Sequence, residues 1–366
     1  MDGEMVYFFL YDVGAFLQLE NIDSIDQALS GELKVENLES TRAMPRYVKF
    51  PYYLSYKLEE KELRTSHGSL LVNINLKLFP IGVVSYEVHV PFSGQHLGTL
   101  SSFYWLSLEN GESSQGLDAY IEGVHHTVLE AIKPNMVNLY EVRVEPETQT
   151  VFCLTRVNRR ERQALTMQAI AALLSNERES DRISPQLVEE KTQYRYSYYS
   201  DDLLVIDWDA ALILEPFGQY DSILLTLELA NLQLLELRTY DKYLDRALTK
   251  AYEDIQRFFA TRNRLKSPRK IIKELAETKL DFAPVTDYIV NITKFFGDWY
   301  LGRIYTLASE RFHLSQWQGI VSQKIDMLNS LYSMLNLEAT NNRLLILEFL
   351  VVLLFIIDVI LIFFSL

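Results

Sequence analysis

The spacing of apolar positions changes once along the chain, near Gly218. Before it, from Met5 to about Phe92, short runs are rich in β-branched and aromatic residues, which predicts strands. In LVNINLKLF, apolar and polar residues alternate, as expected of a strand with one face toward solvent. Residues 117–132 and 159–175 have helical composition. This first part is therefore predicted to be a sheet with helices.

Two further segments of the first part predict strands. Residues 139–157, LYEVRVEPETQTVFCLTRV, are expected to form a hairpin that turns at residues 146–149. Residues 201–215, DDLLVIDWDAALILE, are an apolar run broken by two acids and Trp208. That run predicts a strand or a pair of strands, with Trp208 in the core.

The second part of the chain has helical spacing. Residues 221–259 contain neither Pro nor Gly, and their apolar positions recur every three, four or seven residues. A second helix is expected to begin near Val285 and to keep a heptad seam whose one polar position is Gln318. We predict that the two helices pair antiparallel as a stalk. The apolar positions of the two seams are Leu234, Leu237, Leu244, Leu248, Ala251 and Ile255, and Leu314, Val321, Ile325, Leu328, Tyr332 and Leu335.

The sequence closes on residues 344–366, of which 20 of 23 are apolar. At about 1.5 Å per residue, a helix of this length crosses the roughly 30 Å hydrocarbon layer of a membrane. The alternative is a buried core helix, but apolar runs of about 18 residues or more are typical of membrane spans. Arg343, directly before the segment, favours a cytoplasmic location for the preceding chain. We expect a tail-anchored, single-pass membrane protein with its N-terminal bulk in the cytoplasm.

These patterns together predict an α+β fold. We expect a mixed sheet domain with flanking helices, then a long antiparallel helical stalk and one C-terminal transmembrane helix. The expected divisions are 1–218 for the α+β domain, 219–343 for the stalk and 344–366 for the anchor. A basic connection at 262–273 is expected to join the two stalk helices.

Charge narrows the classes of partner. The formal net charge of −14 argues against a general nucleic-acid binder and against adhesion to anionic lipid. One short segment, residues 262–273, is basic in this otherwise acidic chain. It is expected to be either a solvated loop or a surface for a protein partner, with RNA as a weaker alternative. The single cysteine, Cys153, makes no intrachain disulfide. The basic patch consists of Arg262, Arg264, Lys266, Arg269, Lys270 and Lys273.

Candidate chemistry is sparse. The sequence has no phosphate-binding loop, nucleophile elbow, HExxH or paired CxxC motif, and it implies no cofactor. His125 and His126 are adjacent, and neighbouring helical residues point about 100° apart, which disfavours a shared metal. On a strand, Asp207 and Asp209 would share one face, suited to a divalent cation or to acid and base catalysis, or would cap the strand and face solvent. Asp201 and Asp202 belong to the same acidic group.

Two acids lie inside the final apolar segment. Glu348 and Asp358 are ten residues apart, so both lie on one broad face of a helix. A central Asp costs about 2.5 to 3.5 kcal/mol in a membrane. Asp358 is therefore expected either to pair across an oligomer interface or to reach the far headgroups.

Three features resemble a known family: the opening YFFLYDVGAFLQL, the pair of long helices and the closing LEFLVVLLFIID. With them the chain looks like a distant member of the required-for-meiotic-nuclear-division (RMD/YagE) family. Glu348, Phe349 and Asp358 stand at positions similar to the acid, the aromatic residue and the second acid of that family's terminal pattern. The segment YSYYSDDLLVIDWDAALILEP matches no motif of the family. The resemblance implies a membrane-anchored, self-associating protein and supplies no catalytic residues.

A second resemblance is architectural. CorA-type magnesium transporters also place an α/β domain and long stalk helices before C-terminal spans, but their Gly-Met-Asn filter is absent here. The leading expectation is a non-enzymatic, homo-oligomeric membrane scaffold that offers its α+β domain to a cytoplasmic protein partner. The alternatives are a CorA-like cation transporter with Asp358 lining the pore, and a metal-dependent enzyme that uses Asp207 and Asp209.

Overall fold

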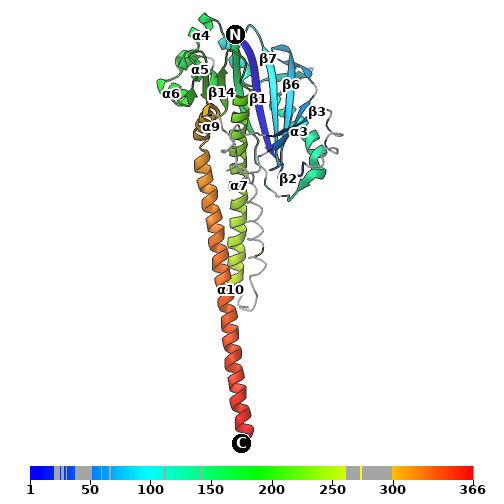
Figure 1. The fold of residues 1–366 in the computed structure, drawn as a ribbon, viewed down its shortest axis with the longest axis vertical. Coiled ribbons are helices and arrows are strands. Elements are labelled where there is room, and N and C mark those ends of the chain that lie inside the picture. The colour runs from blue at the N-terminus through cyan, green and yellow to red at the C-terminus, as the bar shows by residue number, and fades with distance from the viewer. Residues whose placement is uncertain are drawn as a thin grey trace. The chain divides into compact units, whose positions relative to one another are not determined.

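The computed structural model describes residues 1–19, 25, 29, 31–37, 52–58, 60–65, 67–110, 113–139, 142, 144–177, 179–260, 273 and 299–365 (Figure 1). The chain forms two compact units. Unit 1 comprises Met1–Thr239 and Pro284–Trp317, and unit 2 comprises Tyr240–Ala283 and Gln318–Leu366. Helices α7 (Asp221–Ala260) and α10 (Leu314–Ser365) contribute to both units, and the predicted division of the chain stays a prediction.

Unit 1 contains one mixed sheet with the strand order β12-β13-β14-β11-β1-β7-β6-β5-β8-β9, and β4 pairs with both β3 and β6. Its pairings are antiparallel except the parallel pairing of β11 with β14, so the predicted α+β class with a mixed sheet is confirmed. The strands are β1 Asp2–Asp12, β3 Gly31–Asn37, β4 Tyr52–Leu58, β5 Lys61–Thr65, β6 Gly68–Phe79, β7 Val83–Phe92, β8 Ser107–Asn110, β9 Ser113–Gly116, β11 Glu147–Arg156, β12 Arg195–Tyr196, β13 Leu203–Ile206 and β14 Ala210–Leu214. A separate pair joins β2 (Phe16–Leu17) to β10 (Met136–Val137).

The two faces of the sheet are covered by different helices. Tyr7 and Phe9 of β1 belong to an apolar core with α3 (Leu117–Ile132) and α5 (Met167–Leu174). The alternate residues of β1 point the other way, toward α7, since Leu10 lies opposite Ser85 and Ser85 donates to Glu228 of that helix. The remaining helices of unit 1 include α4 (Arg159–Ala164), α6 (Pro185–Thr192) and α9 (Trp299–Arg311).

The predicted hairpin at residues 139–157 is not formed. Its second half is β11, but β11 begins at Glu147, inside the expected turn, and residues 144–146 before it are not strand. β11 pairs instead with β1 and β14, which come from distant parts of the sequence. Both edges of β11 are therefore occupied, and the preceding residues have no free edge to pair with.

The first half of α7 is buried on every side. Residues 226–237 are all buried, including Glu228, Asn231 and Gln233. The sheet covers one side of the helix, and α9 contributes another contact, in which the Tyr305 hydroxyl donates to Gln233 Oε1. A helix that is buried all round needs partners for each of its polar side chains.

Lys77 of β6 lies beneath α7, between two carboxylates. Its Nζ is 3.0 Å from Glu87 of β7 and 2.5 Å from Glu228 of α7, and all three side chains are buried. Ser85 Oγ also donates to Glu228, at 2.6 Å. Burial alone would lower the pKa of Lys77, but the charges of Glu228 and Glu87 outweigh it and raise that pKa. Lys77 therefore stays a buried cation.

His89 extends this network along β7. Its ring nitrogens lie 3.2 Å from Glu4 of β1 and 3.5 Å from Glu87. Burial opposes the charged ring, but the hydrogen bonds and charges of Glu4 and Glu87 raise the pKa of His89 to about 9. Burial would likewise raise the pKa of Glu87, yet Lys77 and His89 lower it to about 2. Positive and negative side chains thus alternate across β1, β7, β6 and α7.

In unit 2 the second half of α7 packs beside α10. Lys324 Nζ of α10 lies 2.5 Å from Asp241 and 2.6 Å from Asp245 of α7. The predicted seam positions of α7, such as Leu248, are buried. On α10, Leu314, Leu328 and Leu335 are buried, whereas Val321, Ile325 and Tyr332 are half-buried. The long C-terminal helical region of the prediction is therefore confirmed.

The direction of these two helices differs from the predicted antiparallel pair. Asp241 and Asp245 contact Lys324, whereas Tyr252, further along α7, shares a groove with Met327 and Leu331, further along α10. The unit 2 portions of α7 and α10 thus run in the same direction (Figure 1). The expected start of the second helix near Val285 lies outside the described residues. From Trp299 onward the helical region is divided into α9 and α10, and α10 begins at Leu314 after a left-handed turn residue, His313 with φ 53°. Residues 261–298, which connect α7 to α9, lie outside the described residues apart from Lys273.

Replacing Lys77 tests the buried network. Lys77→Met is expected to lower the free energy of unfolding by about 3–5 kcal/mol, because Glu87 and Glu228 would remain buried without their cation. Urea denaturation of the detergent-solubilised protein measures this loss. Lys57→Met is the matched control, because Lys57 is half exposed in its ion pair with Glu60 and its loss should cost less than about 1 kcal/mol. Equal losses of unfolding free energy in the two variants would contradict the stabilising role of the buried Lys77.

Candidate binding site

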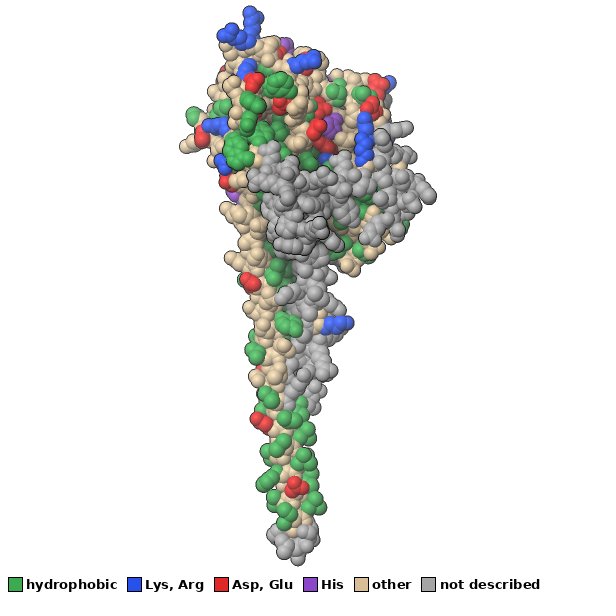
Figure 2. All heavy atoms as spheres, viewed as in Figure 1, with side chains coloured by type: hydrophobic (Ala, Val, Ile, Leu, Met, Phe, Trp, Pro, Cys, Tyr) green, Lys and Arg blue, Asp and Glu red, His purple; other side chains and the backbone are tan. Residues whose placement is uncertain are grey.

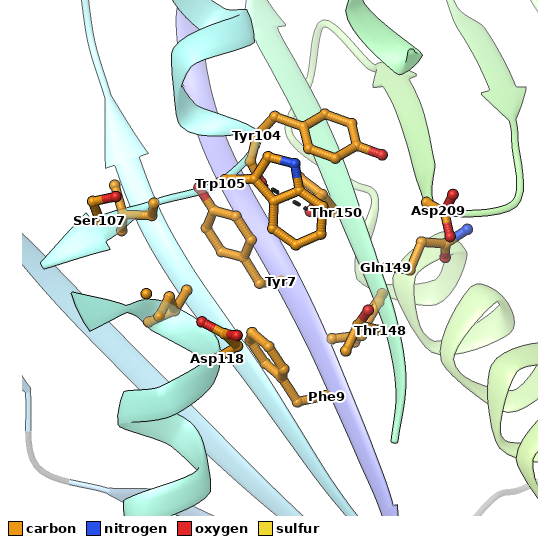
Figure 3. A pocket seen from close by; sticks show the side chains of 14 residues that line it. Tyr7, Phe9, Tyr104, Trp105, Ser107, Asp118, Thr148, Gln149, Thr150 and Asp209 are labelled. Carbon is orange, nitrogen blue, oxygen red and sulfur yellow. Dashed lines mark hydrogen bonds between the residues drawn. The ribbon is translucent and has the colours of Figure 1, made fainter. Parts of the chain in front are cut away.

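A pocket of about 100 Å³ lies in unit 1, on the face of the sheet opposite α7 (Figure 3). Its lining comes from β1, from the segment that leads into β8, from the start of α3, from β11 and from the turn between β13 and β14. The lining residues with side chains that bear on its chemistry are Tyr7, Phe9, Tyr104, Trp105, Asp118 and Asp209.

Strand pairing places the part of the lining that comes from β1 and β11. Tyr7 lies opposite Thr150 and Phe9 opposite Thr148 in the β1–β11 register, so all four side chains share one face of the sheet. Phe8 and its partner Gln149 point to the other face. The Tyr7 hydroxyl donates to the carbonyl of Phe103, which ties β1 to the segment that carries Tyr104 and Trp105.

The aromatic wall of the pocket is partly open. Tyr104 is buried and lies against Trp105, with ring centroids 5.4 Å apart and planes at 57°. The Trp105 side chain is nevertheless 66% exposed. Burial raises the pKa of the Tyr104 hydroxyl, and the nearby carboxylates of Asp209 and Asp207 raise it further.

Asp207 and Asp209 occupy the turn between β13 and β14, not one strand. The predicted pair of strands is present, and Asp207 N donates to the Ala210 carbonyl across the turn, at 2.8 Å. Asp207 is fully buried, whereas Asp209 is exposed at the pocket. The turn therefore gives the two carboxylates different surroundings instead of a shared face.

Asp207 is held by two cations. Its Oδ2 lies 2.6 Å from Lys191 Nζ of α6, and its Oδ1 accepts hydrogen bonds from Arg311 of α9, one of them from Nε at 2.9 Å. Trp208 beside it is half-buried and packs edge-on against Phe312 at 5.8 Å. These contacts tie the β13–β14 turn to α6 and α9, so Asp207 has a structural role.

Asp209 has no such partner among the described side chains. Partial desolvation at the pocket raises the pKa of Asp209, and the neighbouring charge of Asp207 raises it further, against the opposing charges of Lys191 and Arg311. Of the remaining acids of this group, Asp202 Oδ1 accepts from the Tyr198 backbone at 2.8 Å and the Asp201 carbonyl accepts from Arg162. Within the described ranges, no three His, Cys, Asp or Glu side chains gather as a metal would require.

The adjacent histidines also have different surroundings. His125 stacks on Tyr11, with ring centroids 4.0 Å apart, and its Nδ1 lies 3.1 Å from the Tyr86 hydroxyl. Burial, with a smaller contribution from His126, lowers the pKa of His125 to about 4. His126 is exposed. His125 therefore packs α3 against the sheet as a neutral ring.

The other predicted site residues lie away from the pocket. Glu348 and Asp358 are exposed on α10 in unit 2, ten residues apart as expected. Of the basic patch, Lys273 alone is among the described residues, so Arg262, Arg264, Lys266, Arg269 and Lys270 stay a prediction. Sequence reasoning missed Tyr7, Trp105 and Asp118. The aromatic content of the first strand was a signal for Tyr7, and no pattern in the sequence indicated the other two.

Comparison with known proteins places the chain in a family. The family model described as "Uncharacterized protein MJ0711, N-terminal domain" matches residues 2–221, and the chain belongs to this family. A curated relative, the uncharacterized protein MJ0711 of Methanocaldococcus jannaschii, is 26% identical over 219 residues. The match covers 59% of this chain and 65% of that relative, so it spans less than two thirds of the relative's length. No solved structure matches.

This family is not the RMD/YagE family of the sequence resemblance, so that expectation is corrected. That resemblance rested on apolar segments at the two ends of the sequence and on the pair of long helices, and apolar patterns of this kind are shared by many unrelated proteins. The matched region instead contains the sheet and every lining residue of the pocket.

Substitutions at the two turn aspartates should separate their roles. Asp207→Asn is expected to lower the free energy of unfolding by about 3 kcal/mol, because Lys191 and Arg311 would lose their buried counter-charge. Asp209→Asn should change it by less than about 0.5 kcal/mol or stabilise the protein, because its surroundings disfavour the charged form. Urea denaturation near neutral pH measures both, and a larger loss for Asp209→Asn would contradict this division.

Proposed function

We propose that this protein is a membrane-anchored, non-enzymatic scaffold that self-associates through unit 2 and offers unit 1 to a cytoplasmic protein partner. The observation that carries the proposal is the segment Leu344–Ile362 of α10, which is long and apolar enough to cross a membrane and is not buried at all within the chain. Figure 2 shows the hydrophobic side chains that cover this end of α10. A soluble core helix would instead be mostly covered by its own chain.

The magnitude of the exposed apolar surface supports an anchor. Each fully exposed Leu, Ile, Phe or Val forgoes roughly 1.5–3 kcal/mol relative to burial. Phe349, Leu354, Phe355 and Ile362 of this segment are each more than half exposed. Nineteen helical residues at about 1.5 Å each match the roughly 30 Å hydrocarbon layer, so a membrane would remove this cost.

Removal of the segment tests the anchor. A variant that ends at Arg343 is expected to leave the membrane fraction and to remain folded in solution, while the full chain stays in membranes washed at high salt. Circular dichroism checks the fold of the released chain. Protease added to sealed vesicles checks the cytoplasmic orientation. Retention of the shortened chain in washed membranes would overturn the single-anchor proposal.

Self-association is supported by an apolar stripe on the free side of α10 in unit 2. Ile320, Met327 and Met334 follow at intervals of seven residues and are 42%, 50% and 42% exposed. They lie apart from the seam of Leu328 and Leu335, which is buried within the chain. A seven-residue apolar interval is the spacing of a helix that pairs with another helix.

The occupant that we propose for this stripe is the stripe of a second copy. Met327 also lines an open groove of about 320 Å³ with Tyr252 of α7, beside which another helix can lie. Two copies anchored in one membrane carry α10 in the same orientation and at the same height. The membrane thus already aligns the two stripes. Because less rotational and translational freedom is lost when they pair, the entropic cost of pairing is lower.

Replacing the stripe tests the pairing. The triple variant Ile320→Gln, Met327→Gln and Met334→Gln is expected to lower the subunit number in detergent while leaving the helix content and melting temperature nearly unchanged, because all three side chains are exposed. Light scattering gives the mass. The control Ser322→Gln with Asn336→Gln changes exposed positions on the opposite side of α10 and should keep the assembly. An unchanged mass in the triple variant would overturn this interface.

Asp358 favours one further candidate function. A carboxylate inside a span is costly and seldom faces lipid, so the presence of Asp358 in this segment favours an oligomer in which it faces its copies or a cation path. This is the CorA-like alternative. Cation flux into vesicles that contain the reconstituted protein would favour that alternative over a scaffold.

A further inference from the structure

Aromatic rings and unpaired carboxylates meet in the pocket of unit 1. We propose that this pocket binds the head group of a small organic cation, an alkylated ammonium, between the rings of Tyr7, Tyr104 and Trp105 and the carboxylates of Asp118 and Asp209. This inference goes beyond the proposed scaffold function and does not depend on the membrane anchor.

The aromatic side supplies the attraction that a soft cation needs. The face of an aromatic ring is electronegative, and a cation within about 6 Å of it gains roughly 0.5–2 kcal/mol, with Trp the strongest partner. Trp105 remains 66% exposed although it borders a formed pocket and contacts Tyr104. An indole held at a pocket mouth presents this face to a ligand, at the cost of leaving apolar surface in water.

The carboxylates face the pocket from two sides. Asp118 comes from the first turn of α3 and Asp209 from the β13–β14 turn, and Figure 3 shows them on either side of the aromatic residues. Neither has an ion-pair partner in the described part of the chain, and no Lys or Arg lines the pocket. Asp207, two residues from Asp209, binds both Lys191 and Arg311. Lys191 and Arg311 are therefore paired with Asp207, and the charged side chains that line the pocket are the carboxylates of Asp118 and Asp209.

Other classes of ligand fit less well. An anion would meet two carboxylates, and the start of α3, where an anion could bind, already carries Asp118. A Ca²⁺ ion takes about six to eight oxygen ligands, whereas two carboxylates and aromatic rings supply few. The volume of about 100 Å³ is well below the roughly 300–1,000 Å³ typical of sites for drug-sized ligands. A compact cationic head group matches both the charge and the size.

This head group has two sources in a cell: a free molecule such as choline, or a methylated lysine side chain of a protein. The recognising chemistry is the same for both. Calorimetric titration of the detergent-solubilised full chain with choline, and separately with a peptide that carries trimethyllysine, distinguishes them. The corresponding neutral compound, 3,3-dimethylbutanol, has the shape of choline without its charge.

We expect at least one of the two cations to bind, and the neutral compound to bind at least about tenfold more weakly, a difference of roughly 1.4 kcal/mol. Trp105→Ala should weaken cation binding about 5- to 30-fold, the range that a cation–π contact at a partly desolvated site supplies. Asp118→Asn and Asp209→Asn should each weaken it as well. Glu109→Gln is the matched control, because Glu109 is an exposed acid of β8 that does not line the pocket.

Thermal unfolding by circular dichroism checks that each variant is folded, and all four substituted positions are exposed. Equal binding of choline and its neutral analogue would overturn the proposal. So would a loss of affinity in Glu109→Gln as large as that in Asp118→Asn or Asp209→Asn. The proposal would also be overturned if neither cation bound at concentrations up to about 10 mM, which corresponds to a binding free energy weaker than roughly −3 kcal/mol.

Discussion

The contact between Lys77 and Glu228 is the interaction on which the rest of unit 1 depends. It sets α7 on the sheet, because a buried cation and a buried carboxylate cannot be separated without leaving both unpaired. One helical turn further on, Asn231 donates to Gln149 Oε1 of β11 at 2.9 Å, and Gln149 Nε2 donates to the Asp207 carbonyl at 3.2 Å. A chain of polar contacts thus runs from the middle of the sheet to the turn that carries Asp209. The wall of the pocket is fixed from behind by the same helix that the buried lysine positions.

The sequence predicts which segments form strands and helices better than it predicts which of them pair with one another. Apolar and polar residues alternate in β6, and apolar residues recur every three or four positions in α7. Both patterns arise because one face of the element is buried, so they can be recognised in the sequence. The pairing of β11 with β1 and β14 joins residues far apart in the sequence, so the local signal at residues 139–157 indicated a hairpin that does not form. The direction of α10 relative to α7 could not be predicted either, because apolar spacing is the same for parallel and antiparallel helices. The predicted seam positions of α7 are buried, as are Leu314, Leu328 and Leu335 of α10, whereas the other three predicted positions of α10 are half-buried.

The pocket was hidden from sequence reasoning for a related reason. Its chemistry comes from Tyr7, Trp105, Asp118 and Asp209, which four separate segments supply and the fold of unit 1 brings together. No spacing in the sequence connects them. Asp207 and Asp209 did attract attention as a pair, but a strand was assumed where a turn occurs, and the turn sends the two carboxylates in different directions. The family match at residues 2–221 covers the whole pocket and ends where α7 begins, so the pocket belongs to the part of the chain that the family shares.

The contrast between the two turn aspartates bears on why the pocket has its present composition. Asp207 is buried, and Lys191 and Arg311 compensate its charge, which stabilises the turn. Asp209 lies beside it without a partner among the described residues, and both partial desolvation and the charge of Asp207 raise its pKa. A carboxylate without a counter-charge does not add to the free energy of unfolding. An indole that is mostly in water, such as Trp105, adds little to it either. Side chains that contribute little to the stability of a fold and converge on one cavity are typical of a binding site. An organic cation would neutralise the Asp209 carboxylate and cover the Trp105 ring at once.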